Sequence, residues 1–328
     1  MQTVRVLAAS DLMHLVPMRD AIEAVRAGFL GLASGRARVP LRVHLETPSG
    51  VALWMPAAVE GHGLGVKAVA VFPENPSRGL PTIHAAFLLQ DAETGRPLGL
   101  VEGASLTALR TGAATGLATD LLARRDAGIV ALLGSGAQAG RQLEAVCTVR
   151  DVTQVRVYSP TPGRREAFAA WAREQPWVRG ASVFAAPSAS AAVRGADVVV
   201  TATTSRLPVF APEDLSPGAH VNAIGAFTPQ MREIPAEVVR SARVVVDSLE
   251  AARAEAGDLI QAEQEGAFEW GRAVELGRLL TDPSLGRRAP EEVTLFKSVG
   301  LAVQDVVVAA LALQRAFEQG VGAEVPWA

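Results

Sequence analysis

The chain has 328 residues, 49% of them hydrophobic, and a formal net charge of −3. A chain of this length is expected to form two domains, because single hydrophobic cores stop growing at about 250–300 residues. Acidic and basic residues are interspersed, so no basic stripe follows a phosphate backbone and we expect no nucleic-acid binding. The single cysteine, Cys147, cannot form an intrachain disulfide and is interpreted as a buried structural thiol.

No segment of the sequence predicts secretion or membrane insertion. The stretch from Met1 to Ser10 lacks the long apolar region of a secretory signal. The most apolar late stretch, Val299 to Leu313, is interrupted by Gln304 and Asp305, so it is too short and too polar to span a bilayer. We therefore expect a cytoplasmic protein without a membrane partner.

The N-terminal third predicts an α+β arrangement with a mainly antiparallel sheet. Apolar residues at helical spacing predict a first helix from Ala21 to Leu32. The segment from Asp91 to Pro97 contains Gly95 and predicts a hairpin loop between two strands. Strand-like runs are found at Val51–Pro56, Gly65–Phe72, Ile83–Gln90 and Leu98–Val101.

The remainder of the chain predicts a doubly wound α/β domain. It is preceded by a helix from Ser105 to Arg124, in which Gly112 and Gly116 lie one turn apart and permit another backbone to approach closely. Continuous apolar runs then alternate with helical patterns, which is typical of parallel strands buried on both faces. A last long helix is predicted from Thr294 to Phe317. The apolar runs are Gly128–Leu133, Gln154–Tyr158, Ala196–Ala202, His220–Ile224 and Arg243–Val246.

A glycine-rich turn follows the first of these runs. Gly134, Gly136 and Ala139 form a G-x-G-x-x-A pattern between a predicted strand and a predicted helix, which is the context that dinucleotide binding requires. Gly134 permits the tight turn, Gly136 leaves room for the pyrophosphate, and the helix N-terminus offers free N–H groups to the phosphates. The alternative is a purely structural glycine turn.

The end of the second apolar run bears on the choice of cofactor. A site that prefers NAD usually places Asp or Glu there to hold the ribose 2′-hydroxyl, whereas this chain has Ser159. Ser159, Thr161, Arg164 and Arg165 suit a 2′-phosphate, so we predict NADPH as the cofactor with NADH as second choice. The alternative is a solvated basic loop that opens a helix.

Three cations of the N-terminal part lie in unusual surroundings. Lys67 falls within the apolar run Val66–Val71, and Arg110 lies mid-helix among apolar residues and threonines. Together with Arg42 they suggest an anionic ligand such as a carboxylate, which arginine binds through two parallel hydrogen bonds. Internal salt bridges or snorkelling side chains explain the pattern equally well, and spacing alone does not decide between these interpretations.

Other titratable residues give weaker signals. The five histidines share no spacing typical of metal ligands and there is no cysteine cluster, so we predict no metal. His44 and His84 lie close in sequence to Arg42 and Thr82, and face either a substrate or the protein interior. Three carboxylates are interpreted either as acid–base groups or as structural groups at turns and helix starts: Glu233, Asp247 and Asp258.

The chain resembles the ornithine cyclodeaminase/μ-crystallin family nearly from end to end. The T-A-x-R-T segment around Arg110, linked to the glycine-rich turn, is the most specific part of the resemblance. The segments that carry it are Lys67, Gly79–Thr82, Glu102–Thr115, Gly134–Ala139, Val221–Gly225 and Thr294–Gly300.

The resemblance implies the fold and a set of site residues. It implies a Rossmann domain, residues 119–299, inserted into an α+β substrate-binding and dimerisation domain, residues 1–118 and 300–328, and a homodimer. It implies that Arg42, Lys67 and Arg110 contact a substrate carboxylate and that Val299 lies near the substrate. The residues that it places near the cofactor, besides Gly134 and Gly136, are Thr82, Ala137, Gln138, Ser159, Thr203, Ala223, Ile224 and Ser298.

The same resemblance bounds the activity. The family contains cyclodeaminases, alanine dehydrogenases and ketimine reductases, so membership does not fix the reaction. We predict NADPH-dependent reduction of a cyclic imino acid, Δ1-pyrroline-2-carboxylate or Δ1-piperideine-2-carboxylate, to L-proline or L-pipecolate. Lys67 and a water near Thr228 are the candidates for the proton donor. The alternatives are ornithine cyclodeaminase, alanine dehydrogenase and a protein that binds NADPH without catalysis.

One departure from the family pattern favours the reductase. In the cyclodeaminases an aspartate follows the Asn-Ala-x-Gly-Gly stretch and handles the amino group during ammonia loss. The matching position here is Phe227, which cannot ionise or hold an ammonium group. The alternative is that Phe227 points into the core and another acid replaces the aspartate.

Overall fold

The computed structural model describes residues 2–327, which divide into two units. The first unit comprises the chain up to Thr111 and again from Leu301 onward, and the second comprises Gly112–Gly300. The chain therefore leaves the first unit once and returns to it once. Among the helices of residues 2–327, none combines the length and apolarity that crossing a membrane requires.

The first unit contains one mixed sheet. Its strands are β1 (Thr3–Leu7), β2 (Ala37–Arg38), β3 (Val43–Thr47), β4 (Gly50–Val59), β5 (Gly63–Val71), β6 (Ile83–Gln90), β7 (Pro97–Glu102) and β16 (Ala323–Pro326). The spatial order is β16-β1-β7-β6-β5-β4-β2, with β3 also paired to β4. Only the β1–β7 pair is parallel among these described strands, so the predicted antiparallel character is confirmed.

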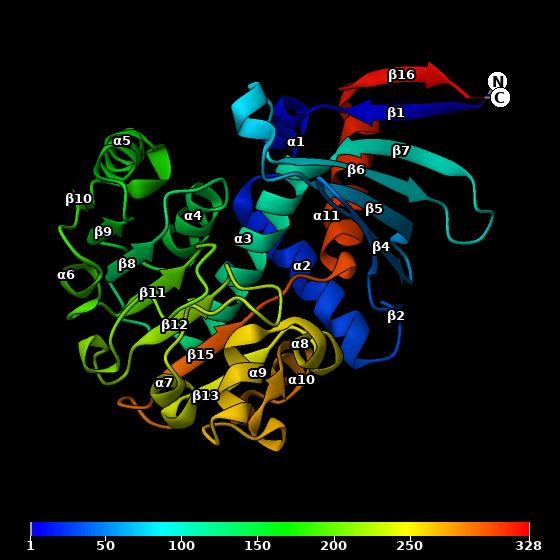
Figure 1. The fold of residues 1–328 in the computed structure, drawn as a ribbon. Helices are drawn as coiled ribbons and strands as arrows, with labels where there is room; N and C mark the ends of the chain where they lie inside the picture. The colour runs from blue at the N-terminus through cyan, green and yellow to red at the C-terminus, as the bar shows by residue number, and fades with distance from the viewer. Residues whose placement is uncertain (1, 328) are drawn as a thin grey trace. The chain divides into compact units, whose positions relative to one another are not determined.

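Helices cover one face of this sheet. They are α1 (Ala9–Leu15), α2 (Met18–Ala33) and α11 (Ala302–Gln319). In Figure 1, α11 runs along the sheet and α2 packs against α11. Side chains alternate between the two faces of the sheet along each strand. Met55, Lys67 and Phe87 are paired neighbours on the face that the helices cover, and all three are buried. Their neighbours on the opposite face, such as Trp54 and Ala68, are exposed.

The second unit is a parallel sheet of eight strands. They are β8 (Ile129–Leu133), β9 (Gln154–Tyr158), β10 (Ser182–Ala185), β11 (Val198–Thr201), β12 (His220–Ala223), β13 (Arg243–Val246), β14 (Val274–Glu275) and β15 (Thr294–Lys297). Their spatial order is β10-β9-β8-β11-β12-β15-β13-β14, and every pair is parallel. The strand order reverses between β8 and β11, which confirms the predicted doubly wound fold.

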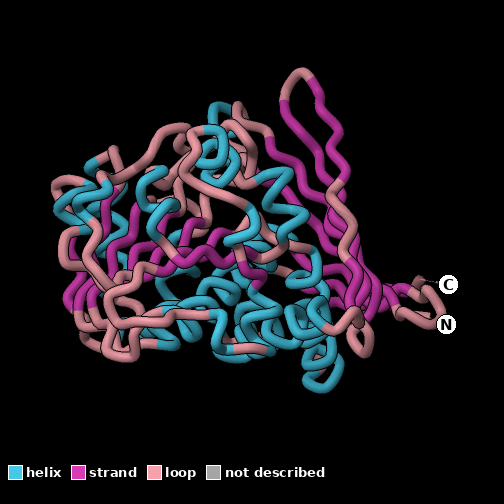
Figure 2. Tube along the Cα trace, turned by 90° about the horizontal axis from the view of Figure 1, so that it is seen from below, coloured by secondary structure: helices cyan, strands magenta, loops and turns pink. Residues whose placement is uncertain are grey.

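Helices connect the strands of the second unit. They are α4 (Ala139–Val149), α5 (Pro162–Arg173), α6 (Ala189–Val193), α7 (Ala236–Ser241), α8 (Leu249–Glu255), α9 (Gly257–Gln264) and α10 (Leu276–Thr281). Figure 2, coloured by secondary structure, shows the strands gathered into sheets with helices alongside them. The core between β8, β9 and their helices is built from Val130, Leu132, Leu143, Val155 and Val157.

The helix α3 (Gly103–Leu122) contains the boundary between the units. The boundary after Thr111 lies earlier than the predicted one at residue 118, because the C-terminal half of α3 packs within the second unit. A Cβ on Gly112 would lie 2.6 Å from the carbonyl oxygen of Arg141, so glycine is required for this close approach. The buried guanidinium of Arg150 donates to the carbonyls of Thr119 and Ala123, each at 2.9 Å, and so satisfies the end of the helix.

The long helix predicted from Thr294 to Phe317 is present as α11, but its predicted start at Thr294 is wrong. Residues Thr294–Lys297 form strand β15, which pairs with β12 on one side and β13 on the other. The helix α11 begins only at Ala302, after Gly300, whose φ of 84° breaks the helical backbone. A short apolar run of this kind has no periodicity that separates a buried strand from a buried helix.

Candidate active site

The glycine-rich turn has the shape that a dinucleotide pyrophosphate requires. Gly134 has a φ of 117°, and a Cβ there would lie 2.4 Å from the carbonyl oxygen of Ala202. A Cβ on Gly136 would instead meet nothing within 4 Å, so the backbone faces open space where the pyrophosphate would approach. Ala139 is fully buried at the start of α4, which explains the small residue at that position.

The start of α4 supports the same interpretation. Gln138 is the N-cap of this helix, and no side chain caps it. Because the free N–H groups of a helix N-terminus attract anions, the turn fits the phosphates of a dinucleotide. Ala137, beside it, is exposed.

The adenosine end of the predicted site lies after β9. The hydroxyl of Ser135 donates to the Ser159 hydroxyl at 2.9 Å. Arg165 donates to the Ser159 carbonyl at 3.1 Å, and its guanidinium stacks over the Tyr158 ring at 5.5 Å. Arg165 therefore already makes a hydrogen bond and a ring contact within the loop itself. Thr161 and Arg164 are exposed at the start of α5, which has no acidic residue in its first turn.

The other predicted cofactor residues lie at the carboxyl ends of β11, β12 and β15. Thr203 is half-buried just beyond β11, and the other three are buried: Ala223, Ile224 and Ser298. In open α/β sheets this edge is where ligands bind. These four residues end or follow three different strands, and the fold brings them to one edge of the sheet.

Asp247 has a structural role in this unit. One of its oxygens accepts hydrogen bonds from the Ser298 hydroxyl at 2.9 Å and from the backbone N–H groups of Val299 and Gly300 at 2.9 and 2.7 Å. The carboxylate is buried and has its acceptor sites filled. Of the two interpretations of Asp247, a group that holds a turn is the one these contacts support.

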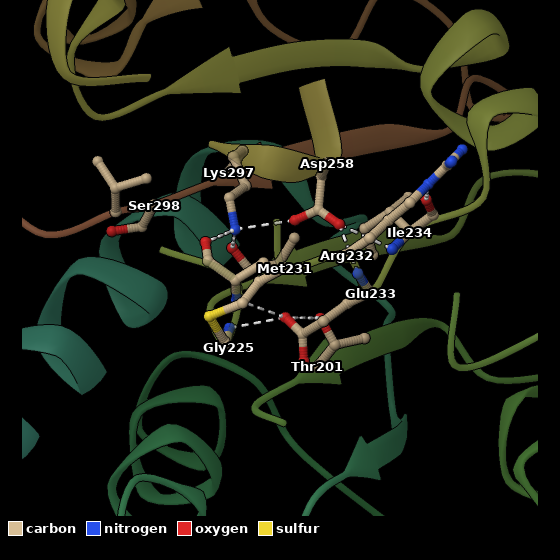
Figure 3. Close-up of polar contacts among 12 residues, drawn as sticks. Thr201, Gly225, Met231, Arg232, Glu233, Ile234, Asp258, Lys297 and Ser298 are labelled. Atoms are coloured by element: carbon tan, nitrogen blue, oxygen red, sulfur yellow. Dashed lines mark hydrogen bonds and ion pairs between the residues drawn. The ribbon is translucent and has the colours of Figure 1, made fainter. Parts of the chain in front are cut away.

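Glu233 and Asp258 are also buried and bound to backbone groups (Figure 3). Asp258 accepts from the N–H groups of Glu233 and Ile234 at 2.6 and 2.9 Å and forms an ion pair with Lys297 at 2.9 Å. Glu233 accepts from Thr201 and from three backbone N–H groups of the loops beyond β11 and β12. Burial and the nearby Asp258 carboxylate raise the pKa of Glu233.

The first unit brings two of the predicted cations together. The Lys67 ammonium lies 3.0 Å from both oxygens of Asp305 and is 1% exposed. Arg110 forms an ion pair with the same carboxylate at 3.2 Å and donates to the Gln304 amide oxygen at 2.6 Å. Internal salt bridges are therefore present, yet Lys67 and Arg110 share one carboxylate.

Electrostatics in this cluster act against the charge on Lys67. Burial, together with the positive charges of Arg110 and Arg42, lowers the pKa of Lys67 to about 7, while Asp305 acts in the opposite direction. Arg42 therefore lies within electrostatic range of the cluster, although it is only half-buried. Excess positive charge in a buried site is what a carboxylate ligand would neutralise.

The remaining predicted residues lie on several elements of the two units. Thr82 is half-buried, and its carbonyl accepts from Phe72 at 2.8 Å; Val299 is buried in the second unit. His44 and His84 are exposed. Phe227, beyond β12, is 37% exposed, so it does not point into the core.

Sequence reasoning missed Asp305, Gln304 and Lys297. The first two form a polar pair in an apolar stretch, and the pair was used only to exclude a membrane span. Lys297 is one of only two lysines in the chain, and both are buried. Lysine is almost never fully buried without a partner. The two lysines, each in an apolar run, could therefore have indicated that buried acidic partners exist elsewhere in the sequence.

Comparisons with known proteins agree along the whole chain. The model of the ornithine cyclodeaminase/mu-crystallin family matches residues 2–320. A Δ1-pyrroline-2-carboxylate reductase of Bacillus cereus is 40% identical over 98% of this chain and 99% of its own length. The structure of the Thermococcus litoralis Δ1-pyrroline-2-carboxylate reductase with NADH and L-proline has a TM-score of 0.92 at 40% identity, covering 98% of this chain and 99% of that one. An archaeal alanine dehydrogenase dimer with bound NAD has the same TM-score at 35% identity, covering 100% of both chains.

Lys67 is expected to titrate near neutral pH. The chain has two lysines, so isotope-labelled lysine gives two side-chain signals in an NMR titration, and Lys67→Met identifies which is which. We expect one signal with a midpoint near pH 7. Two signals that both stay constant from about pH 6 to about pH 9 would contradict the burial argument.

The same shift has a consequence for stability. In the unfolded chain Lys67 regains the ordinary pKa of 10.5, so between about 7 and 10.5 the unfolded state binds more protons than the folded state. The contribution of Lys67 to the free energy of unfolding therefore rises with pH across this window. Below pH 7 its full destabilising effect is present.

Proposed function

The chain belongs to the ornithine cyclodeaminase/mu-crystallin family, and we propose that it is an NAD(P)H-dependent reductase of a cyclic imino acid. The substrate is Δ1-pyrroline-2-carboxylate, or its six-membered analogue Δ1-piperideine-2-carboxylate, and the product is L-proline or L-pipecolate. The prediction from the sequence and the activity of the similar Δ1-pyrroline-2-carboxylate reductases agree on reduction of a cyclic imino acid. The observation that carries the proposal is the pair of buried cations, Lys67 and Arg110, sharing one carboxylate.

The residues of the chain act mainly by orientation. Arg110 and Lys67, with Arg42, hold the substrate carboxylate and so fix the position of the imine carbon. A reduced nicotinamide, when bound, would supply the hydride that this carbon accepts. The imine nitrogen must gain a proton, and Lys67 is poised to hold it because its pKa is about 7. Asp305 keeps Lys67 and Arg110 in place through its two oxygens.

The proposal extends to a homodimer. Large apolar side chains are exposed on the first-unit sheet and its neighbouring loops, where a monomer usually carries polar residues. The structure of a similar alanine dehydrogenase is a dimer. We assign this surface to a second copy of the chain, because packing of two copies would remove these apolar side chains from water. Its exposed residues are Leu41, Val43, Leu45, Trp54 and Leu64.

Loss of the Arg110 guanidinium is expected to lower kcat/KM for the imino acid by about 100-fold, because a charge-assisted hydrogen bond is lost in the transition state as well as in the complex. The change is Arg110→Met, and affinity for the reduced cofactor should stay nearly constant. A matched control is Arg5→Met, since Arg5 is another buried arginine of the first unit, paired with Glu324. Equal losses in both variants would remove the support for a carboxylate contact.

The cofactor preference is expected to favour NADPH over NADH by about tenfold or more. Ser159 replaces an acidic ribose ligand, and Arg164 offers an exposed cation beside it. A charge-assisted phosphate contact contributes roughly 1.5–3 kcal/mol. Specificity constants for the two cofactors are measured side by side, and again in Arg164→Ala, which should lose NADPH efficiency while keeping that for NADH. Equal constants for the two cofactors in the unaltered protein refute the preference.

Cyclodeamination is expected to be absent. Phe227 occupies the position of the cyclodeaminase aspartate and cannot accept a proton, so ornithine with NAD⁺ should release no ammonia while a cyclic imino acid with NADPH is reduced. The two rates are measured on one preparation, with pyruvate plus ammonia as a third arm for alanine dehydrogenase activity. Ammonia release from ornithine at a rate comparable to imine reduction would falsify the reductase assignment. A preparation that binds NADPH but turns over none of these substrates would favour the non-enzymatic alternative.

A further inference from the structure

A buried network of opposite charges holds the loop beyond β12 from both sides (Figure 3). The Lys297 ammonium donates to the carbonyls of Ala223 and Ala226 at 3.2 and 2.5 Å. The Glu233 carboxylate accepts from the N–H groups of Gly225 and Ala226 at 2.7 and 3.2 Å. Carbonyls therefore point to the cation and N–H groups to the anion, and the loop from 223 to 226 has one electrostatically favoured conformation.

Glu233 also joins this loop to the end of β11. It accepts from the Thr203 N–H at 2.7 Å and from the Thr201 hydroxyl at 2.9 Å. A Cβ on Gly225 would lie 2.1 Å from the Thr203 carbonyl oxygen and 2.5 Å from Glu233 Oε1, so the contact requires glycine. The carboxylate thus lies directly behind Thr203 and Gly225, at the strand ends where a doubly wound fold binds its ligand.

The network carries an unbalanced charge. Glu233, Asp258 and Lys297 are all 0% exposed, and two carboxylates face one ammonium. Burial and Asp258 raise the pKa of Glu233, whereas its hydrogen bonds favour the charged form. We infer that Glu233 is ionised, because three of its four hydrogen-bond donors are backbone N–H groups. Such groups cannot accept a hydrogen bond from the O–H of a neutral carboxyl. One net negative charge is therefore buried at this edge.

We propose that Glu233 is a positioning residue that fixes the nicotinamide-binding edge and favours the oxidised, cationic nicotinamide over the reduced, neutral one. The inference rests on the proposed reductase function for its chemistry. In that reaction the C4–H bond of the reduced ring breaks, a C–H bond forms at the imine carbon, and the imine nitrogen takes a proton. The ring gains a positive charge as the hydride leaves, and a buried negative charge nearby stabilises that product.

The test measures binding without any substrate. Dissociation constants of the oxidised and reduced dinucleotide are determined by calorimetry and by nicotinamide fluorescence for the unaltered protein and for Glu233→Gln. We expect the ratio of the oxidised to the reduced constant to rise by roughly fivefold to tenfold in the variant. Because no imino acid is present, the result stands even if the protein reduces a different substrate.

A matched control separates charge from lost hydrogen bonds. Asp197 precedes β11, at the strand end opposite Thr201, and accepts from the N–H groups of Gly128 and Ile129 and from Arg124. Asp197→Asn therefore makes the same exchange of a carboxylate for an amide, among a similar set of contacts, at the far end of the same strand. It should leave the ratio unchanged, and an equal rise in this control would overturn the proposal.

A second variant covers the case in which Glu233→Gln does not fold. Asp258→Asn removes one negative charge from the network and keeps an oxygen for the N–H groups of Glu233 and Ile234. The ratio should rise here as well, and a folded variant of either kind with an unchanged ratio overturns the proposal. In the unaltered protein the oxidised form should bind at least as tightly as the reduced form. Binding of the oxidised form that is weaker by about tenfold would contradict the proposal without any variant.

Discussion

Burial of positive charge is the physical constraint on which the first unit depends. A lysine or arginine removed from water is strongly unfavourable unless a partner and hydrogen bonds replace the lost hydration. Lys67 and Arg110 have one such partner, Asp305, which both of them share. Burial, followed by the positive charge of Arg110, lowers the pKa of Lys67 to about 7 in spite of this partner. A ligand carboxylate would restore the balance, which is why the same arrangement that is unfavourable alone suits an imino acid.

The second unit also buries charged side chains, and there their role is to bind backbone groups at the ends of the strands. The ends of its parallel strands leave backbone N–H and carbonyl groups without sheet partners, and buried charges satisfy them. Glu233 and Lys297 do so beyond β12, and Asp247 does so between β15 and Gly300. Both lysines of the chain therefore serve buried networks rather than the surface. Rigid loops at this edge are what a cofactor needs to meet a substrate in one orientation.

Features of the fold could be predicted from the sequence where a local pattern is compatible with only one structure. The turn at Gly134 and the hairpin around Gly95 were found because only a few conformations suit those glycines. The strand Thr294–Lys297 was mistaken for helix, since a four-residue buried run has no period of its own. Asp305 was missed because its partner, Lys67, is distant in sequence, and no local pattern records a contact between them.

We propose that the buried cations recognise the carboxylate of a cyclic imino acid. The most direct test compares Δ1-pyrroline-2-carboxylate with Δ1-pyrroline, the same ring without the carboxylate, as substrates of the unaltered protein with NADPH. Two charge-assisted contacts are lost with the carboxylate, so kcat/KM should fall by about 1000-fold. Reduction of the two rings with comparable efficiency would contradict the account.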